Sequence, residues 1–165
     1  MSVAEWVLAV ERAYVAAATG HANTGGDRAN LARARAAAAA IASRYLAVSA
    51  PHSFGIVGAS DEDAELVLEA HRTWFEPRDI RRDVRALACD IVCVYDATPI
   101  RTGDVRRGTH VNLLGSGAID SELVATITDE RHGLPALAAG LVDGRRLDEI
   151  TIFIGGDVAI ALAAI

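Results

Sequence analysis

The fold is decided by residues 53–63, which read Ser-Phe-Gly-Ile-Val-Gly-Ala-Ser-Asp-Glu-Asp. An apolar run ends at Gly58, and apolar residues at helical spacing begin at Ala64. A buried strand, a glycine turn and a helix, in this order, open the Rossmann-type nucleotide-binding unit. The stretch therefore predicts a strand over 53–58, followed by a helix whose first turn is acidic.

Outward from this unit, apolar strands alternate with helical segments. We expect strands over 90–95, 109–114 and 150–154, a short strand and a helical turn within 74–88, and helices over 2–20, 29–46 and 121–128. Such alternation places a parallel sheet between two layers of helices. The predicted class is α/β: a Rossmann-like parallel sheet with helices on both faces, and N-terminal helices in addition.

The N-terminal part is expected to be helical. Ser2 and Glu5 have the spacing of a capping box, and the second helix is rich in alanine, which lets a helix pack closely. The chain has 165 residues, about the size of one domain, with no linker or repeat. We predict a single domain over 1–165, with helices in 1–48 and the Rossmann-like core in 53–165.

Composition excludes several classes of function. The net charge of −6 argues against a nucleic-acid partner, and since all 16 basic residues are arginine, Schiff-base chemistry on lysine is excluded. No apolar run is long enough to span a membrane, and no signal peptide is visible, so we expect a cytoplasmic protein. Cys89 and Cys93 lack zinc-site or disulfide spacing, and the histidines lack metal-ligand spacing, so no metal is expected.

The glycine turn departs from the dinucleotide-binding fingerprint G-x-G-x-x-G. Gly58 is present, but Ser60 stands where the second glycine would meet the pyrophosphate, and Asp63 stands near the third. Asp61, Glu62 and Asp63 also place negative charge where a helix N-terminus would attract phosphate. These residues favour a turn retained for folding and argue against intact NAD(P) binding.

Further short motifs follow one another in a fixed order. They are residues 37–47 (AAAAIASRYLA), 54–58 (FGIVG), 88–93 (ACDIVC), Ala97-Thr98-Pro99, 108–112 (GTHVN), Gly115, Glu122-Leu123 and 144–153 (GRR, then EITIF). Together they resemble the ornithine cyclodeaminase/mu-crystallin family over most of the chain. The resemblance implies NAD-assisted oxidation of an amino acid, with hydride passing to the nicotinamide. It also implies cofactor contacts at Gly58, Ser60, Thr98 and Pro99.

Several functional positions of the family are altered here. The catalytic aspartate falls on Gly117, and Asp120 is the acid nearest to it. The substrate-binding lysine has no counterpart in a chain without lysine. The substrate-binding arginine falls on Ala34, with Arg33 and Arg35 on either side. Asp120 is therefore the candidate catalytic residue, and Arg33 and Arg35 are the candidate substrate-binding residues.

The resemblance also implies two deletions, one between Gly20 and Ala29 and one between Trp74 and Arg85, so we expect a sheet reduced in strand number. Loss of several functional positions together points to a catalytically degenerate family member. Such a protein would act by self-assembly or protein binding, as a homo-oligomer or with a full-length relative. We expect the alanine-rich helix and residues 158–165 to form its contacts. The alternatives are an NAD(P)-dependent amino-acid or imine oxidoreductase or cyclodeaminase, and a nucleotide or metabolite sensor without turnover.

Overall fold

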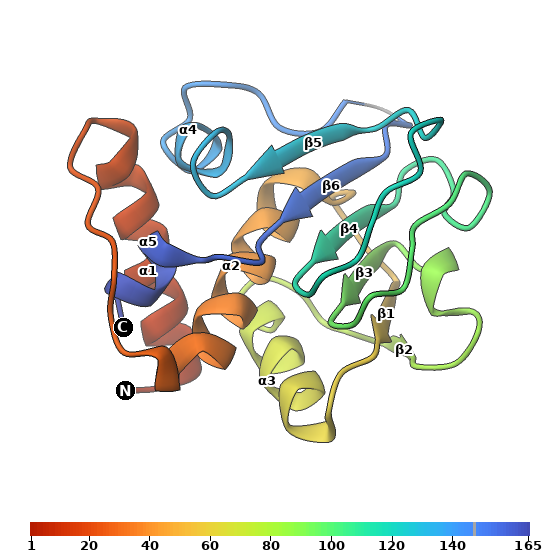
Figure 1. The fold of residues 1–165 in the computed structure, drawn as a ribbon, viewed down its shortest axis with the longest axis horizontal. Coiled ribbons are helices and arrows are strands. Elements are labelled where there is room, and N and C mark those ends of the chain that lie inside the picture. The colour runs from red at the N-terminus through yellow and green to blue at the C-terminus, as the bar shows by residue number, and fades with distance from the viewer. Residues whose placement is uncertain (147) are drawn as a thin grey trace.

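The computed structural model describes residues 1–146 and 148–165 (Figure 1). Six parallel strands form one sheet in the order β2-β1-β3-β4-β6-β5. The strands are β1 (Ser53–Val57), β2 (Asp79–Arg81), β3 (Ile91–Val94), β4 (His110–Leu113), β5 (Thr126–Asp129) and β6 (Thr151–Ile154). The helices are α1 (Val3–Ala18), α2 (Leu31–Leu46), α3 (Asp61–His71), α4 (Leu134–Ala138) and α5 (Ala159–Ala163), with short 3₁₀ helices η1 (Arg28–Asn30) and η2 (Ala86–Ala88). The predicted α/β class with a Rossmann-like parallel sheet is confirmed.

The N-terminal capping box is also confirmed. The Ser2 hydroxyl accepts a hydrogen bond from the Glu5 amide at 3.2 Å, and the Glu5 carboxylate accepts one from the Ser2 amide at 2.5 Å. Beyond this cap, α1 turns Trp6, Val10 and Tyr14 into the core. Among the described residues, no helix combines the length and the hydropathy that crossing a bilayer requires.

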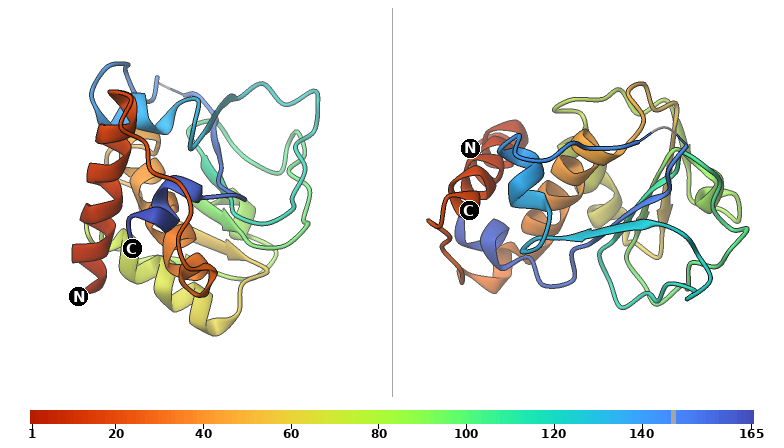
Figure 2. Two further views of the ribbon diagram at one scale, coloured as in Figure 1. Left: turned by 60° about the vertical axis from the view of Figure 1, so that its left-hand side comes forward. Right: turned by 90° about the horizontal axis from the view of Figure 1, so that it is seen from above.

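The helices form two layers on one face of the sheet (Figure 2). The inner layer holds α2 and α3, and α1 packs on α2 from outside, together with α4 and α5. Ala34 and every alanine from Ala36 to Ala42 are fully buried. Their small side chains let α2 lie between α1, α3 and the sheet, as the composition of this helix predicts.

This packing corrects the expected contact surfaces. The alanine-rich helix and residues 158–165 were expected to cover a partner. The alanines of α2 are instead enclosed by the chain itself, and Ile160, Ala161 and Leu162 of α5 are buried where α5 contacts α1 and α2. The side chains of these buried residues are therefore not available to a partner.

The second face of the sheet is covered by loops. Val92, Val111 and Ile152 on this face pack against Ile100 and Val105 of the loop after β3, and η2 lies against β1. No α-helix of the described residues covers this face, so the expectation of helices on both faces holds for one face only.

The helix predicted over 121–128 is wrong, because its second half is β5. Ile127 pairs with Ile152 of β6. The run Thr126-Ile127-Thr128 is β-branched, which suits a strand better than a helix. Pairing with β6 supplies its backbone with hydrogen-bond partners.

The first half of the sheet is short. The usual Rossmann order places two strands beyond the first strand, whereas of the strands described here only β2, with three residues, lies beyond β1. The three residues of β2 lie in the segment between Trp74 and Arg85, where the resemblance implies a deletion. The sheet nevertheless keeps six strands, because β5 extends its opposite end.

Candidate functional site

The strand order defines where a ligand would bind. From β1 the sheet grows to β2 on one side and to β3 on the other, so the loops that follow β1 and β3 leave in different directions. Open parallel sheets bind ligands in the crevice that such a change of direction leaves at the carboxyl ends of the strands. We call this rim of the sheet the carboxyl edge. It comprises residues 58–60, 96–98, 115–117 and 155–157, which follow β1, β3, β4 and β6.

Gly58 is required at the start of this edge. Its φ is 69°, a left-handed conformation that side chains rarely adopt, and a Cβ atom there would lie 2.3 Å from the carboxylate of Asp96. The loops after β1 and β3 are therefore in direct contact at the change of direction. This supports the interpretation of Gly58 as the first glycine of the fingerprint.

Ser60 acts locally as the cap of α3. Its hydroxyl accepts a hydrogen bond from the Asp63 amide at 3.1 Å. Arg82, directly after β2, donates to the Ala59 carbonyl and to the Asp61 carboxylate, both at 2.6 Å. One of the three acids in the first turn thus has a cationic partner, and the glycine turn is tied to β2.

The loop after β3 brings Thr98 to the same edge. The Asp96 carboxylate accepts a hydrogen bond from the Thr98 amide at 2.9 Å, and the hydrogen bonds from Thr98 hold the pKa of Asp96 below its usual value. A Cβ atom on Gly117 would lie 3.1 Å from the Thr98 carbonyl oxygen, so the loops after β3 and β4 also touch. Pro99 follows on the surface and is exposed.

Arg35 reaches the carboxyl edge from α2. One guanidinium nitrogen lies 3.4 Å from the Gly156 carbonyl oxygen. The Arg35 Nε is buried, and no hydrogen-bond partner for it is found in the described part of the chain. Arg33 is exposed and lies two residues earlier, which on a helix is nearly the opposite side. Of the two candidate arginines, the structure brings Arg35 to this edge.

Asp120 lies elsewhere. Its carboxylate accepts hydrogen bonds from the Thr102 hydroxyl at 3.4 Å and from the Glu122 amide at 3.1 Å. The Glu122 amide, followed by the Thr102 amide, lowers the pKa of Asp120. Its own amide donates to the Ile100 carbonyl at 2.8 Å. The residue is part of the loop layer on the second face of the sheet, apart from Arg35 and Gly156.

A buried polar network joins α2, α3, β4 and β6 beneath the helices. Ser43 Oγ lies 2.8 Å from His71 Nε2 and accepts from Asn112 Nδ2 at 3.1 Å. His110 lies between Asn112 Oδ1 at 2.8 Å and Thr151 Oγ1 at 2.9 Å. None of these side chains is more than 1 % exposed, so the Ser43–His71 pair is not accessible to a substrate. His110 is a hydrogen-bonded structural histidine, as expected.

The network was not predicted as a whole. His71 could have been suspected, because it closes the apolar periodicity of its helix. Ser43 and Asn112 give no such signal, since they meet only through the packing of α2 on β4. No group of histidine, cysteine and acidic side chains suited to a metal occurs in residues 1–146 or 148–165. Cys89 and Cys93 are buried free thiols.

The comparisons with known proteins concern the fold. No family profile and no curated protein matches the sequence. An archaeal alanine dehydrogenase dimer with bound NAD matches with a TM-score of 0.81 and 19% identity, over 99% of this chain and 89% of that chain. Thermococcus litoralis Δ1-pyrroline-2-carboxylate reductase, in complex with NADH and L-proline, matches with a TM-score of 0.73 and 18% identity, over 99% and 91%.

A probable ornithine cyclodeaminase from Bordetella pertussis Tohama I gives a TM-score of 0.79 at 14% identity, over 99% of this chain and 90% of that chain. At these identities the matches show a shared fold. They agree with the structural resemblance that the ordered motifs indicated.

Proposed function

We propose that the chain acts by binding and not by turnover, as a catalytically degenerate relative of the ornithine cyclodeaminase/mu-crystallin family. The separation of the candidate catalytic groups carries this proposal. Oxidation of an amino acid needs an acid/base group and a cation for the substrate carboxylate at one substrate. Here Asp120 is held by Thr102 on the second face, whereas Arg35 reaches Gly156 at the carboxyl edge.

An activity assay tests this directly. We expect no amino-acid-dependent reduction of NAD or NADP above background, for the native chain and for Asp120→Asn alike. Turnover that Asp120→Asn abolishes would identify an oxidoreductase or cyclodeaminase and would overturn the proposal.

The carboxyl edge is the surface at which binding is best supported, with a nicotinamide dinucleotide as ligand. Gly58 keeps the left-handed conformation of the tight turn that opens such a site, and the loops after β1 and β3 meet there. Several structures with this fold are described with bound NAD or NADH. Gly58, Ser60 and Thr98 would contact the cofactor, with Pro99 beside them.

The acidic first turn of α3 weakens such binding less than the sequence alone indicates. Asp61 is paired with Arg82. Glu62 lines a surface hollow with Val3, Leu66 and Glu69, on the side of α3 toward the N-terminus of α1. Asp63 has no ion-pair partner among residues 1–146 and 148–165. We therefore expect weak dinucleotide binding that Asp63 limits.

Thermal-shift titration with NAD, NADH, NADP and NADPH measures this binding. A ligand at about 100 times its Kd adds ~2.7 kcal/mol and should raise the Tm by several degrees. Asp63→Asn should tighten binding about threefold, since one charge at a helix N-terminus is removed. Asp143→Asn, an exposed acid outside the carboxyl edge, is the matched control and should leave Kd unchanged. No shift at millimolar cofactor for either protein would remove the dinucleotide from the proposal.

Self-assembly is a second candidate, favoured by the open edge at β5. No described strand pairs with its outer side, where Ile127 is 52% exposed and the neighbouring Val124 is 90% exposed. The other open edge, β2, is short and carries Asp79 and Arg81, and such charges oppose edge-to-edge pairing. A second copy would therefore associate through β5.

Light scattering at tens of micromolar should then give the mass of a dimer. Ile127→Lys should reduce it to the mass of a monomer, because a charge on the edge strand blocks strand pairing. Val84→Lys, at an apolar residue near β2 that is 98% exposed, should leave the dimer intact. A monomeric native chain at this concentration would contradict self-assembly.

A further inference from the structure

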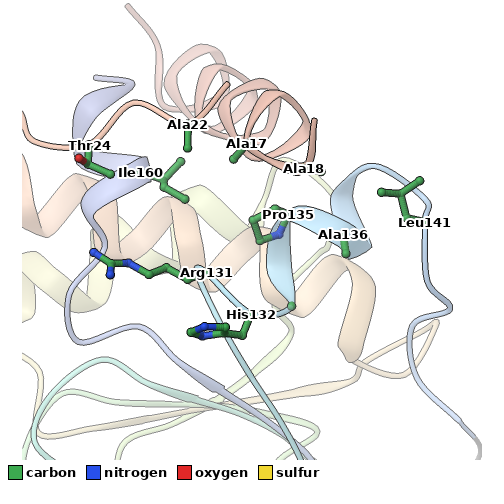
Figure 3. Close-up of a pocket in the computed structure, with 11 residues that line it drawn as sticks. Ala17, Ala18, Ala22, Thr24, Arg131, His132, Pro135, Ala136, Leu141 and Ile160 are labelled. Atoms are coloured by element: carbon green, nitrogen blue, oxygen red, sulfur yellow. The ribbon is translucent and has the colours of Figure 1, made fainter. Parts of the chain in front are cut away.

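A cavity of about 430 Å³ opens where α1, α4 and α5 meet, beyond the end of β5 (Figure 3). β5 is the last strand at one end of the sheet, and three strands separate it from β1 and its glycine turn. The cavity is therefore separate from the proposed dinucleotide site. We call it the α4 pocket. Its volume falls within the range of small-molecule sites.

The two ends of the α4 pocket differ in chemistry. One end is apolar and is built by Ala17 and Ala18 of α1, Pro135 and Ala136 of α4, and Leu141. At the other end, the side chain of Arg131 extends beneath Ile160, on the same side as Thr24 (Figure 3). The carbonyl oxygen of Ala17 accepts a hydrogen bond from the Gly20 amide.

The walls of the pocket are held in place from behind. Glu130, next to Arg131, is 3% exposed; its carboxylate accepts hydrogen bonds from the Tyr14 hydroxyl at 3.2 Å, the Ala161 amide at 3.4 Å and the Ile160 amide. The end of β5 is thereby fixed to α1 and α5. Two residues after Thr24, a Cβ atom at Gly26 would lie 2.5 Å from the Leu162 carbonyl oxygen, so the loop that carries Thr24 rests directly on α5.

Arg131 is available to a ligand. Glu130 is engaged by its three donors, and Asp129 pairs with His132 at 3.0 Å. No ion pair of the Arg131 guanidinium occurs in the described part of the chain. A guanidinium beside a carboxylate ligand forms charge-assisted hydrogen bonds, and the alanine-lined end would bury an alkyl group.

We propose that the α4 pocket binds a small aliphatic carboxylate, with the carboxylate at Arg131 and the alkyl chain between α1 and α4. The site needs neither the dinucleotide nor the carboxyl edge. It is thus a second binding function of the chain.

Calorimetric titration with hexanoate, alongside acetate and 1-hexanol, tests this proposal. We expect hexanoate to bind at millimolar concentration or below, and acetate and hexanol each to bind more weakly, since each lacks one half of the interaction. Arg131→Gln should weaken hexanoate about tenfold. Arg101→Gln, at an exposed arginine of the loop after β3, is the matched control and should change nothing.

Ala136→Phe fills the apolar end and should abolish hexanoate binding, with the fold checked by circular dichroism. Three outcomes would overturn the proposal: hexanoate does not bind, acetate binds as tightly as hexanoate, or Arg131→Gln binds like the native chain. In an NMR titration, amide shifts confined to Ala17, Ala22 and Ala136 would place the ligand independently of affinity.

Discussion

Gly55→Ala is expected to lower the free energy of unfolding by more than about 3 kcal/mol, a large share of the roughly 5–15 kcal/mol typical of a domain. A Cβ atom at Gly55 would lie 2.0 Å from the carbonyl oxygen and 2.7 Å from the carbonyl carbon of Ala86. Both are backbone atoms of η2, so no side-chain rotation relieves the clash.

β1 and η2 are both held in place, so they cannot separate to make room for the methyl group. Gly55 pairs with Arg81 of β2 and with Val92 of β3, which fixes β1 on both sides. Ala86 is 1% exposed, and its carbonyl oxygen accepts a hydrogen bond from the Cys89 amide at 3.2 Å. The added methyl group must therefore displace η2 from the second face of the sheet. No α-helix of the described residues lies on this face to cover the apolar side chains that the displacement would expose.

Urea unfolding of the variant measures this effect. Gly156→Ala is the matched control, because its nearest neighbour, the Gly115 carbonyl oxygen, would lie 3.8 Å from the new Cβ atom, an ordinary contact. We expect a shift of less than about 1 kcal/mol for this control. Equal unfolding midpoints for the two variants would show that η2 does not rest on Gly55 as the structure has it.

The sequence predicts the buried strands well, because each lies in a short run that is rich in apolar residues. β1, β3, β4 and β6 coincide with the runs that begin near Ser53, Asp90, Thr109 and Ile150. β5 is not predicted in this way. It is half-exposed, it alternates threonine with isoleucine, and its partner β6 lies later in the chain, so only the assembled sheet reveals it.

The sequence predicts that the candidate site lies at the carboxyl ends of the strands, but not which side chains meet there. The glycine fingerprint indicated Gly58 and Ser60, and the resemblance to the family implied a cofactor contact at Thr98. Residues that follow parallel strands meet at one rim, and the structure places all three there. Spacing does not distinguish Arg33 from Arg35, because only the orientation of α2 decides which one faces the sheet. It likewise does not reveal that Asp120 follows the Ile100–Ile119 bridge on the second face.

Acidification below pH 6.5 is expected to destabilise the protein steeply, through His71 and His110. Burial lowers the pKa of His71 to about 4 and that of His110 to about 3, from an ordinary value of 6.5. His71 is hydrogen-bonded to the Val67 carbonyl at 2.7 Å and to Ser43, and His110 to Asn112 and Thr151. Both rings are therefore neutral in the folded chain at pH 7.

Stability falls with pH because the unfolded chain binds protons on these histidines before the folded chain does. As pH falls from 6.5, the unfolded chain takes up a proton on each histidine, while the folded chain excludes it until about pH 4 for His71. Each histidine then removes about 1.4 kcal/mol of stability per pH unit. Glu130 has the opposite effect on stability, since burial raises its pKa and the folded chain therefore binds this proton before the unfolded chain does. It offsets part of the loss of stability at the acidic end of this pH range.

Urea unfolding across this pH range gives the slope of stability against pH. His71→Gln keeps hydrogen-bonding groups but removes one titration, so it should roughly halve the slope whatever its effect at pH 7. His52→Gln, at an exposed side chain outside the buried network, should leave the slope unchanged. If NMR showed the His71 and His110 rings titrating near pH 6.5 in the folded chain, both would be solvated, and the buried network between α2, α3 and β4 would not exist as described.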